Sequence, residues 1–157
     1  MKELIKRFYN AFDQLDANTM VACYHKDVVF EDPAFGVLEG DRARAMWQML
    51  CENQKDKDFK VNVYNIKVSD TEGTAQWEAF YIFSKTGKKI HNKINATFEF
   101  KDGLIIKHTD KFSLHKWATQ AFGVTGFIMG KTHFFKSKLN HQTNHLVDKY
   151  IQKKELL

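Results

Sequence analysis

The sequence predicts an α+β fold: a cone-shaped α+β barrel whose strongly curved, mostly antiparallel sheet is covered by N-terminal helices, with an added C-terminal helix. Three observations predict it. Apolar side chains recur at helical spacing through most of residues 2–54. Apolar and polar positions alternate in four long runs between residues 59 and 114, joined by short turns. Such a sheet has one apolar face to bury, and the early helices are the available cover.

The first third of the chain contains three helical patterns and one short strand. We expect helices over residues 2–14, 15–25 and 40–54 and a strand over residues 27–33. Asp16 or Asn18 can cap the second helix with a side-chain oxygen. Pro33, the single proline of the chain, ends the strand because proline has no N–H to donate.

The four long alternating runs predict an antiparallel meander. The expected strands cover residues 59–69, 74–84, 90–100 and 104–114, with turns at Gly87 and at the Asp102–Gly103 pair. A short helix over 115–123 ends at Gly123, and a long helix follows beyond residue 130. We therefore expect a cone-fold domain over residues 1–123. Residues 124–157 form a basic helical extension packed on that domain or on a second subunit.

Charge and composition narrow the classes of partner. The formal net charge is +5, and residues 124–157 hold six lysines against two acids, so most of the excess belongs to the extension. A nearly neutral body is poor evidence for nucleic-acid binding. No apolar run approaches the roughly 18–20 residues of a membrane span, so we expect no membrane partner. Cys23 and Cys51 form no CxxC pair and fit free thiols in a cytoplasmic protein, although a disulfide remains an alternative.

The sequence offers no cofactor or metal motif. It contains no P-loop, GxGxxG, GxSxG or CxxC pattern, so we expect no bound cofactor. His141 and His145 stand four residues apart and could share a helical face, but no further ligand completes a metal set. A solvated basic helix is the favoured interpretation of this segment.

Two motifs carry a resemblance to a known family. They are Y-x-x-D-x-x-F-x-D-P at residues 24–33 and F-x-F-x-D-G-x-I-x-x-H-x-D-x-F at residues 98–112. With the element order, they resemble the nuclear transport factor 2-like superfamily, in its SnoaL-like branch, over about residues 1–122. That branch includes polyketide cyclases, ketosteroid isomerases and limonene epoxide hydrolases. The resemblance implies a cone with an internal pocket and a homodimer formed through the sheet.

The resemblance also implies the site residues. Asp110 matches the acid/base of the cyclases, and alternation sends His108 and Phe112 to the same face. Asp32 matches the general base of the isomerases, although an aspartate before proline can simply cap a turn. The candidate catalytic residues are thus Asp110, His108 and Asp32. The candidate substrate-binding residues are Asn92, Tyr81, Trp77, Trp47, Ile94, Phe112 and Phe8. The aromatic members of this set can also be ordinary core residues.

The sequence lacks residues on which two reactions of the family depend. Phe8 stands where the isomerases place an oxyanion-binding tyrosine, and Ala96 where they place a protonated aspartic acid. Trp77 and Ala79 stand where the epoxide hydrolases need an arginine and an aspartate. These differences argue against ketosteroid isomerase and limonene epoxide hydrolase activity, because both reactions depend on the missing groups.

The sequence thus favours acid/base chemistry, of cyclase, isomerase or lyase type, on an apolar or polyketide-like small molecule in a buried pocket. The alternative is a non-catalytic ligand-binding or protein-interaction module on the same fold, because one fold supports many functions.

Overall fold

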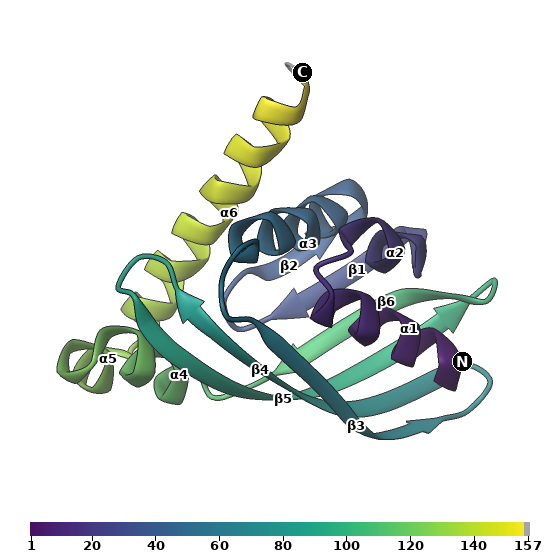
Figure 1. Ribbon diagram of the computed structural model, residues 1–157, viewed down its shortest axis with the longest axis horizontal. Helices are drawn as coiled ribbons and strands as arrows, with labels where there is room; N and C mark the ends of the chain where they lie inside the picture. Colours follow the sequence, from purple (N-terminus) through teal and green to yellow (C-terminus); the bar gives the residue numbers. More distant parts are fainter. Residues whose placement is uncertain (156–157) are drawn as a thin grey trace.

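A single curved sheet of six strands organises the molecule (Figure 1). The computed structural model describes residues 1–155, so the last two positions of the expected extension lie outside the described residues. The strand order is β2-β1-β6-β5-β4-β3, and the sheet stays open between its edge strands β2 and β3. The strands are β1 (Tyr24–Asp32), β2 (Gly36–Glu39), β3 (Lys60–Val68), β4 (Glu72–Phe83), β5 (Lys88–Lys101) and β6 (Leu104–Lys111).

The pairing confirms a mostly antiparallel sheet. Strands β3 to β6 form the expected meander, and β1 joins it through a parallel pairing with β6. The register sets His108 opposite Phe30 on β1 and opposite Phe98 on β5. Because side chains alternate between the two faces of a strand, Asp110 shares the inner face with His108.

Helices cover one face of the sheet and extend past one end. The helices are α1 (Lys2–Asp13), α2 (Ala17–Ala22), α3 (Gly40–Gln54), α4 (Leu114–Phe122), α5 (Val124–Met129) and α6 (His133–Glu155). Figure 1 shows α1, α2 and α3 together over one side of the sheet. Among residues 1–155, no helix combines the length and the apolar character that crossing a bilayer requires.

The structure differs from the sequence-based expectation at three places. The single early strand is a hairpin of β1 and β2, because β2 pairs with β1 from Gly36 to Glu39. Four residues with one buried side chain, Leu38, are too few to give an alternating pattern. The second helix ends at Ala22, and Tyr24 and His25, which were expected in this helix, begin β1. Helix α5 was not expected, because glycine interrupts its short apolar segment.

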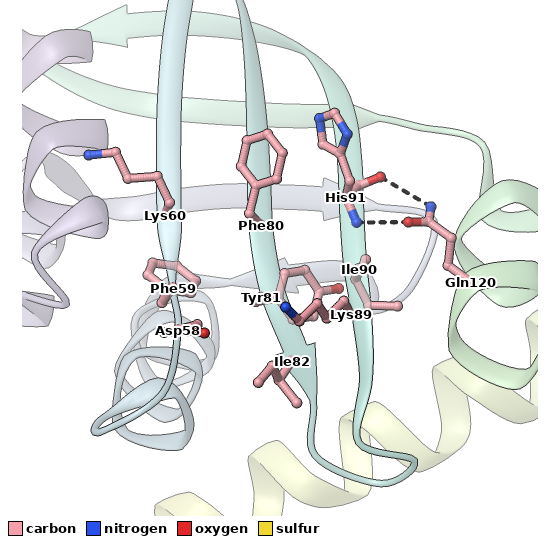
Figure 2. A pocket seen from close by; sticks show the side chains of 10 residues that line it. All are labelled: Asp58, Phe59, Lys60, Phe80, Tyr81, Ile82, Lys89, Ile90, His91 and Gln120. Atoms are coloured by element: carbon pink, nitrogen blue, oxygen red, sulfur yellow. Dashed lines mark hydrogen bonds between the residues drawn. The ribbon is translucent and has the colours of Figure 1, made fainter.

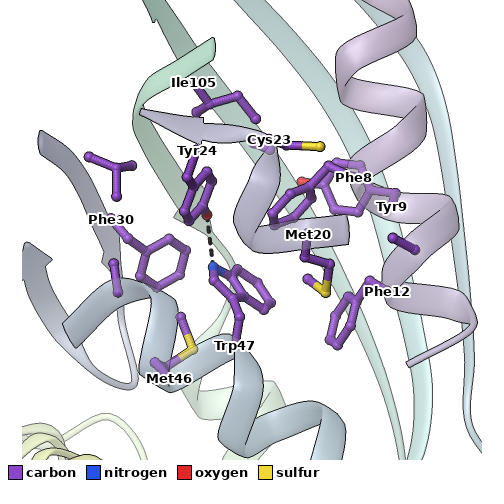
Figure 3. Packing of buried hydrophobic residues seen from close by; sticks show 14 of the residues in the cluster. Phe8, Tyr9, Phe12, Met20, Cys23, Tyr24, Phe30, Met46, Trp47 and Ile105 are labelled. Carbon is purple, nitrogen blue, oxygen red and sulfur yellow. Dashed lines mark hydrogen bonds between the residues drawn. The ribbon is translucent and has the colours of Figure 1, made fainter. Parts of the chain in front are cut away.

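The main core lies between the N-terminal helices and the sheet (Figure 3). Phe8 and Phe12 of α1 pack edge-on against Trp47 of α3, at ring-centroid distances of 5.3 and 5.1 Å. Such aromatic contacts contribute beyond the area that they bury. Cys23 and Cys51 are both buried free thiols, as the sequence predicted.

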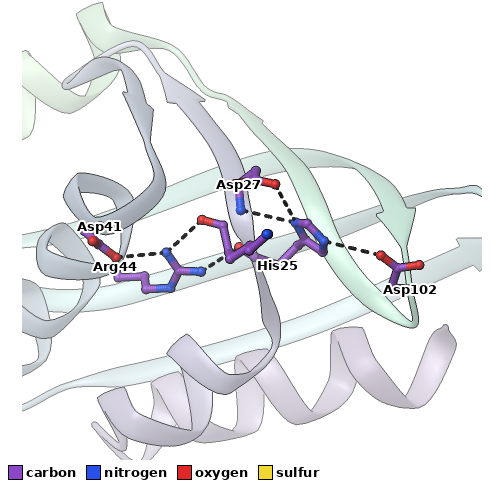
Figure 4. A network of polar contacts seen from close by, with 6 residues as sticks. His25, Asp27, Asp41, Arg44 and Asp102 are labelled. Atoms are coloured by element: carbon purple, nitrogen blue, oxygen red, sulfur yellow. Dashed lines mark hydrogen bonds and ion pairs between the residues drawn. The ribbon is translucent and has the colours of Figure 1, made fainter.

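A polar network holds the start of α3 to β1 (Figure 4). Arg44 donates to the backbone carbonyls of His25 and Lys26, over 2.6 and 3.1 Å. The His25 ring lies between Asp27 and Asp102, and Asp102 belongs to the β5–β6 turn. These contacts hold α3, β1 and the β5–β6 turn together.

Helix α6 packs on its own chain. Val147 is fully buried in the core. The Asn140 amide donates to the carbonyls of Pro33 and Ala34, and the Asn144 amide donates to that of Phe35. Arg42 of α3 pairs with Asp148. The helix therefore covers α3 and the β1–β2 turn together.

Candidate functional site

A largely apolar cavity of about 560 Å³ lies between the sheet, α3, α4 and α6. Most of its wall consists of aromatic and aliphatic side chains. Two acids line it: Asp32 from the end of β1 and Asp110 from β6. An apolar cavity with a few convergent polar groups is the usual form of a small-molecule site.

The cavity brings together eight of the residues that the sequence singled out. They are Asp32, Asp110, Asn92, Tyr81, Trp77, Trp47, Ile94 and Phe112. The other two, His108 and Phe8, are fully buried and are not part of the cavity wall. Their ring centroids lie 5.5 Å apart, behind the wall. His108 therefore has no direct access to a ligand in the cavity, whereas it contacts Asp110.

One oxygen of Asp110 is bound by protein groups. Trp77 Nε1 donates to Asp110 Oδ1 over 3.1 Å, and His108 Nε2 lies 3.0 Å from the same oxygen. Within residues 1–155 no donor reaches Oδ2. The side chain is thus held in one orientation by two rings, while its second oxygen is available to another group.

The hydrogen-bond partners of His108 assign its tautomer. An indole N–H can only donate, so Trp47 Nε1 donates to Tyr24 Oη, over 2.8 Å. A buried hydroxyl hydrogen needs an acceptor, and among residues 1–155 the one in reach is His108 Nδ1, at 2.7 Å, so with a neutral imidazole the Tyr24 hydroxyl donates to Nδ1. The proton of His108 is then on Nε2, directed at Asp110, with Tyr9 Oη a weaker neighbour at 3.3 Å.

Both tyrosines of this network stay neutral. Burial raises the pKa of the Tyr9 and Tyr24 hydroxyls well above the usual value of 10, and the negative charge of Asp110 adds to the rise. They therefore act as fixed hydrogen-bonding groups behind the cavity wall.

Asp32 caps a turn and lines the cavity at the same time. Its Oδ1 accepts the backbone N–H groups of Ala34 and Phe35, over 2.9 and 2.6 Å. No donor within residues 1–155 reaches its Oδ2. Burial raises the pKa of Asp32 from 3.8 to about 7, and the negative charge of Asp110 contributes to the rise against these backbone bonds. The charge of the Asp110 carboxyl therefore affects the protonation of the Asp32 carboxyl.

Two further polar groups face the cavity. Trp117 Nε1 donates to Tyr81 Oη over 2.7 Å, and burial raises the pKa of Tyr81 to about 12, so this hydroxyl keeps a hydrogen to donate. The Asn92 side chain has no hydrogen-bond partner within residues 1–155, which leaves its amide free for a ligand.

Sequence reasoning missed the part of the wall that α4 and α6 supply. Trp117 and Phe122 line the cavity from α4. Leu139, Thr143 and Leu146 line it from α6, together with Gln142 and His145. The spacing of these α6 residues fits one helical face, and that signal was available.

A second, smaller hollow lies along β3, β4 and β5 (Figure 2). Its volume is about 480 Å³, and Phe80 and His91 stack within it at a centroid distance of 4.1 Å. Gln120 of α4 bonds to both backbone groups of His91. One acid, Asp58, lines this hollow. Because it lacks paired carboxyls, the apolar cavity is the candidate site. Within residues 1–155, no three potential metal ligands gather at one place.

The family model of the SnoaL-like domain matches residues 5–108, about two thirds of the chain. The chain belongs to the SnoaL-like family. The matched range includes Asp32, Trp77 and Asn92, and it ends two residues before Asp110. Helices α4, α5 and α6 also lie beyond it. Comparison with curated proteins gave no match.

Solved structures support the same SnoaL-like fold. A putative polyketide cyclase from Xanthomonas campestris pv. campestris is 21% identical, with a TM-score of 0.62, over 76% of this chain and 94% of that one. An LEH-like epoxide hydrolase from M. tuberculosis is 20% identical, with a TM-score of 0.64, over 80% and 92%. A hypothetical protein with a ketosteroid isomerase-like fold, from Catenulispora acidiphila, is 13% identical, with a TM-score of 0.63, over 76% and 92%. Likeness at these identities establishes the fold and leaves the reaction open.

Proposed function

We propose that this SnoaL-like protein is an acid/base enzyme of cyclase, isomerase or lyase type that acts on an apolar or polyketide-like small molecule. Asp110 is the base, Asp32 in its neutral form is the acid, and Asn92 and Tyr81 orient the substrate. The observation that carries the proposal is that two carboxyls with different surroundings line one apolar cavity. Carboxyl pairs of this kind divide acid and base roles between them.

The proposed step is a proton transfer next to a carbonyl group. The free Oδ2 of Asp110 removes a proton from the carbon beside the carbonyl, while the neutral Asp32 carboxyl protonates the carbonyl oxygen. The product of this step is an enol, with Asp110 protonated and Asp32 ionised. In a substrate with a double bond next to the enol, Asp110 returns its proton to the far carbon while Asp32 takes back the enol proton. This completes an isomerisation and restores both carboxyls. A pKa near 7 for Asp32, raised by burial and by the charge of Asp110, favours the neutral acid below neutral pH.

The cavity wall supports an apolar, ring-containing substrate. Trp47, Trp77, Ile94 and Phe112 would contact its faces, and the volume of about 560 Å³ suits a small organic molecule. We assign His108 a positioning role, because it contacts Asp110 and no cavity surface. Phe8 would support the ring of His108 from behind. The similarity to a putative polyketide cyclase supports this substrate class.

Proton exchange tests the proposal without knowledge of the natural substrate. A panel of aryl ketones and 1,3-diketones is incubated with the protein in D2O, and deuterium entry beside the carbonyl is followed by NMR. Asp110→Asn should abolish exchange of any accepted compound, and Asp32→Asn should slow it by about tenfold or more. The matched control is Asp70→Asn, which changes an exposed carboxyl outside the cavity. Unchanged exchange by Asp110→Asn would reject the assignment.

Ligand binding without turnover is the second candidate, because the wall offers many apolar contacts and few polar ones. Native mass spectrometry of the purified protein distinguishes the two functions. Recovery of a compound that the protein holds but does not convert would favour a carrier or sensor. Conversion that depends on Asp110 would favour the enzyme.

We also propose a homodimer formed through the outer face of the sheet, where Tyr64 and Phe80 are exposed. Light scattering of the wild type and of Phe80→Ser tests it. A dimer that the substitution leaves intact would contradict this interface.

A further inference from the structure

Helix α5 packs on the domain through glycines and turns its large apolar side chains outward. A Cβ at Gly126 would lie 1.8 Å from the Ala118 carbonyl oxygen of α4, so α5 approaches α4 more closely than any side chain allows. The side chains of Val124, Phe127 and Ile128 are 76%, 60% and 65% exposed. A surface helix normally does the reverse and buries its apolar stripe.

The exposed apolar surface continues into the next element. Phe134, in the first turn of α6, is 66% exposed. We call the four residues Val124, Phe127, Ile128 and Phe134 the α5 patch. Apolar surface gathered in this way usually marks an interaction site.

The chain segments that form this end of the molecule contain lysines and no acids. Residues 84–91 and 111–147 together contain eight lysines and no aspartate or glutamate. The β4–β5 turn belongs to this region, because Thr86 Oγ1 donates to the Ala121 carbonyl over 2.8 Å and Lys85 Nζ lies 6.0 Å from the Phe122 ring. Figure 1 shows the β4–β5 turn, α4, α5 and the start of α6 together at the end of the molecule away from the N-terminus.

We propose that this end of the protein docks on the surface of an anionic phospholipid bilayer. The α5 patch would enter the boundary between headgroups and acyl chains, and the lysines would contact lipid phosphates. Exposed aromatic and aliphatic side chains beside lysines are the combination that binds such a surface. A nucleic acid would use the lysines and leave the apolar residues in water.

Surface docking differs from the membrane partner that the sequence argued against. That expectation depended on the absence of a spanning segment, and an interfacial attachment needs none. Lys85, Phe122 and Leu139 of this same end also line the cavity. Docking would therefore bring the cavity close to the bilayer, a source of apolar compounds.

Vesicle co-sedimentation of the full chain tests the proposal. The probes are vesicles of phosphatidylcholine alone and of phosphatidylcholine mixed with phosphatidylglycerol. We expect binding to the anionic vesicles only, weakened by salt. The double variants Phe127→Ser/Ile128→Ser and Lys131→Glu/Lys136→Glu should each bind at least about tenfold more weakly.

Controls make the same kinds of change, apolar to serine and lysine to glutamate, at the opposite end of the sheet. Val68→Ser and Lys67→Glu/Lys101→Glu alter exposed positions on β3 and β5 and should bind like the wild type. Circular dichroism verifies that every variant folds, and light scattering gives its oligomeric state. Three results would overturn the proposal: no vesicle binding by the wild type, equal loss in the controls, or a wild-type dimer without vesicle affinity that Phe127→Ser/Ile128→Ser makes monomeric.

Discussion

Tyr24 Oη lies 2.7 Å from His108 Nδ1, although the two residues are 84 positions apart in the sequence. Trp47 donates to the same hydroxyl, so the hydroxyl proton is directed at the histidine. Through this contact, a residue of β1 determines which ring nitrogen of His108 faces Asp110. The orientation of the candidate base thus depends on groups that no ligand touches.

Tyr24→Phe should change the tautomer of His108. Without the donor to Nδ1, the ring proton is no longer confined to Nε2, and the bond to Asp110 weakens. Nitrogen-15 NMR of the histidine ring reports the tautomer directly. Tyr9→Phe is the control, because Tyr9 contacts Nε2 at 3.3 Å and leaves the Tyr24 bond in place. An identical histidine spectrum in Tyr24→Phe would refute the assigned direction of the network.

Trp77→Phe should lower the free energy of unfolding by about 2 kcal/mol, because a buried carboxylate loses an N–H donor. Urea denaturation measures the change. Trp117→Phe removes the same indole N–H, there donated to the neutral hydroxyl of Tyr81, and should cost about 1 kcal/mol. We predict that Trp77→Phe lowers the free energy of unfolding more than Trp117→Phe does. A larger loss for Trp117→Phe would contradict this prediction.

The wild type should lose stability relative to Asp32→Asn as the pH rises from about 4 to about 7. The folded pKa of Asp32, about 7, lies above the unfolded value of 3.8, so ionisation favours the unfolded chain in this window. A fully dry site would give about 4 kcal/mol. Because Asp32 keeps some accessible surface, we expect about 2 kcal/mol.

Urea denaturation of both proteins across this pH range measures the difference. The side-chain amide oxygen that Asp32→Asn introduces can still accept the backbone bonds of the turn. Below pH 4 the difference between the two proteins should be constant. Parallel curves over the whole range would show that Asp32 titrates normally in the folded protein.

Asn140→Ala/Asn144→Ala should loosen α6. The two amides hold the helix to the carbonyls of the β1–β2 turn, and their loss should cost about 2 kcal/mol. Amide hydrogen exchange should accelerate in α6 and in the turn, and stay unchanged in α1. Ser137→Ala, an exposed change in the same helix, is the control and should leave exchange as in the wild type. Unaltered α6 exchange in the double variant would mean that the other contacts of the helix, such as Val147 in the core and the bond from Thr143 to Ala34, anchor it without the two amides.

The sequence by itself determined the class of fold and the facing of the long strands. Alternation along β6 put His108, Asp110 and Phe112 on one face, because the side-chain period of a strand is fixed by its backbone. The resemblance to the SnoaL-like family indicated that this face is the inner one. Local chemistry limited the cap of α2 to Asp16 or Asn18, and in the structure it is the Asp16 side chain that accepts the Thr19 N–H.

Only the tertiary structure decided how deeply each side chain is buried and which groups it contacts. Alternation gives the face of a side chain, so it could not separate Asp110, at the cavity wall, from His108, which Tyr24 and Tyr9 cover from behind. Helical spacing likewise gives α6 an apolar face without saying what that face covers. These properties arise from contacts between segments far apart in the chain, and a local pattern contains no information about them.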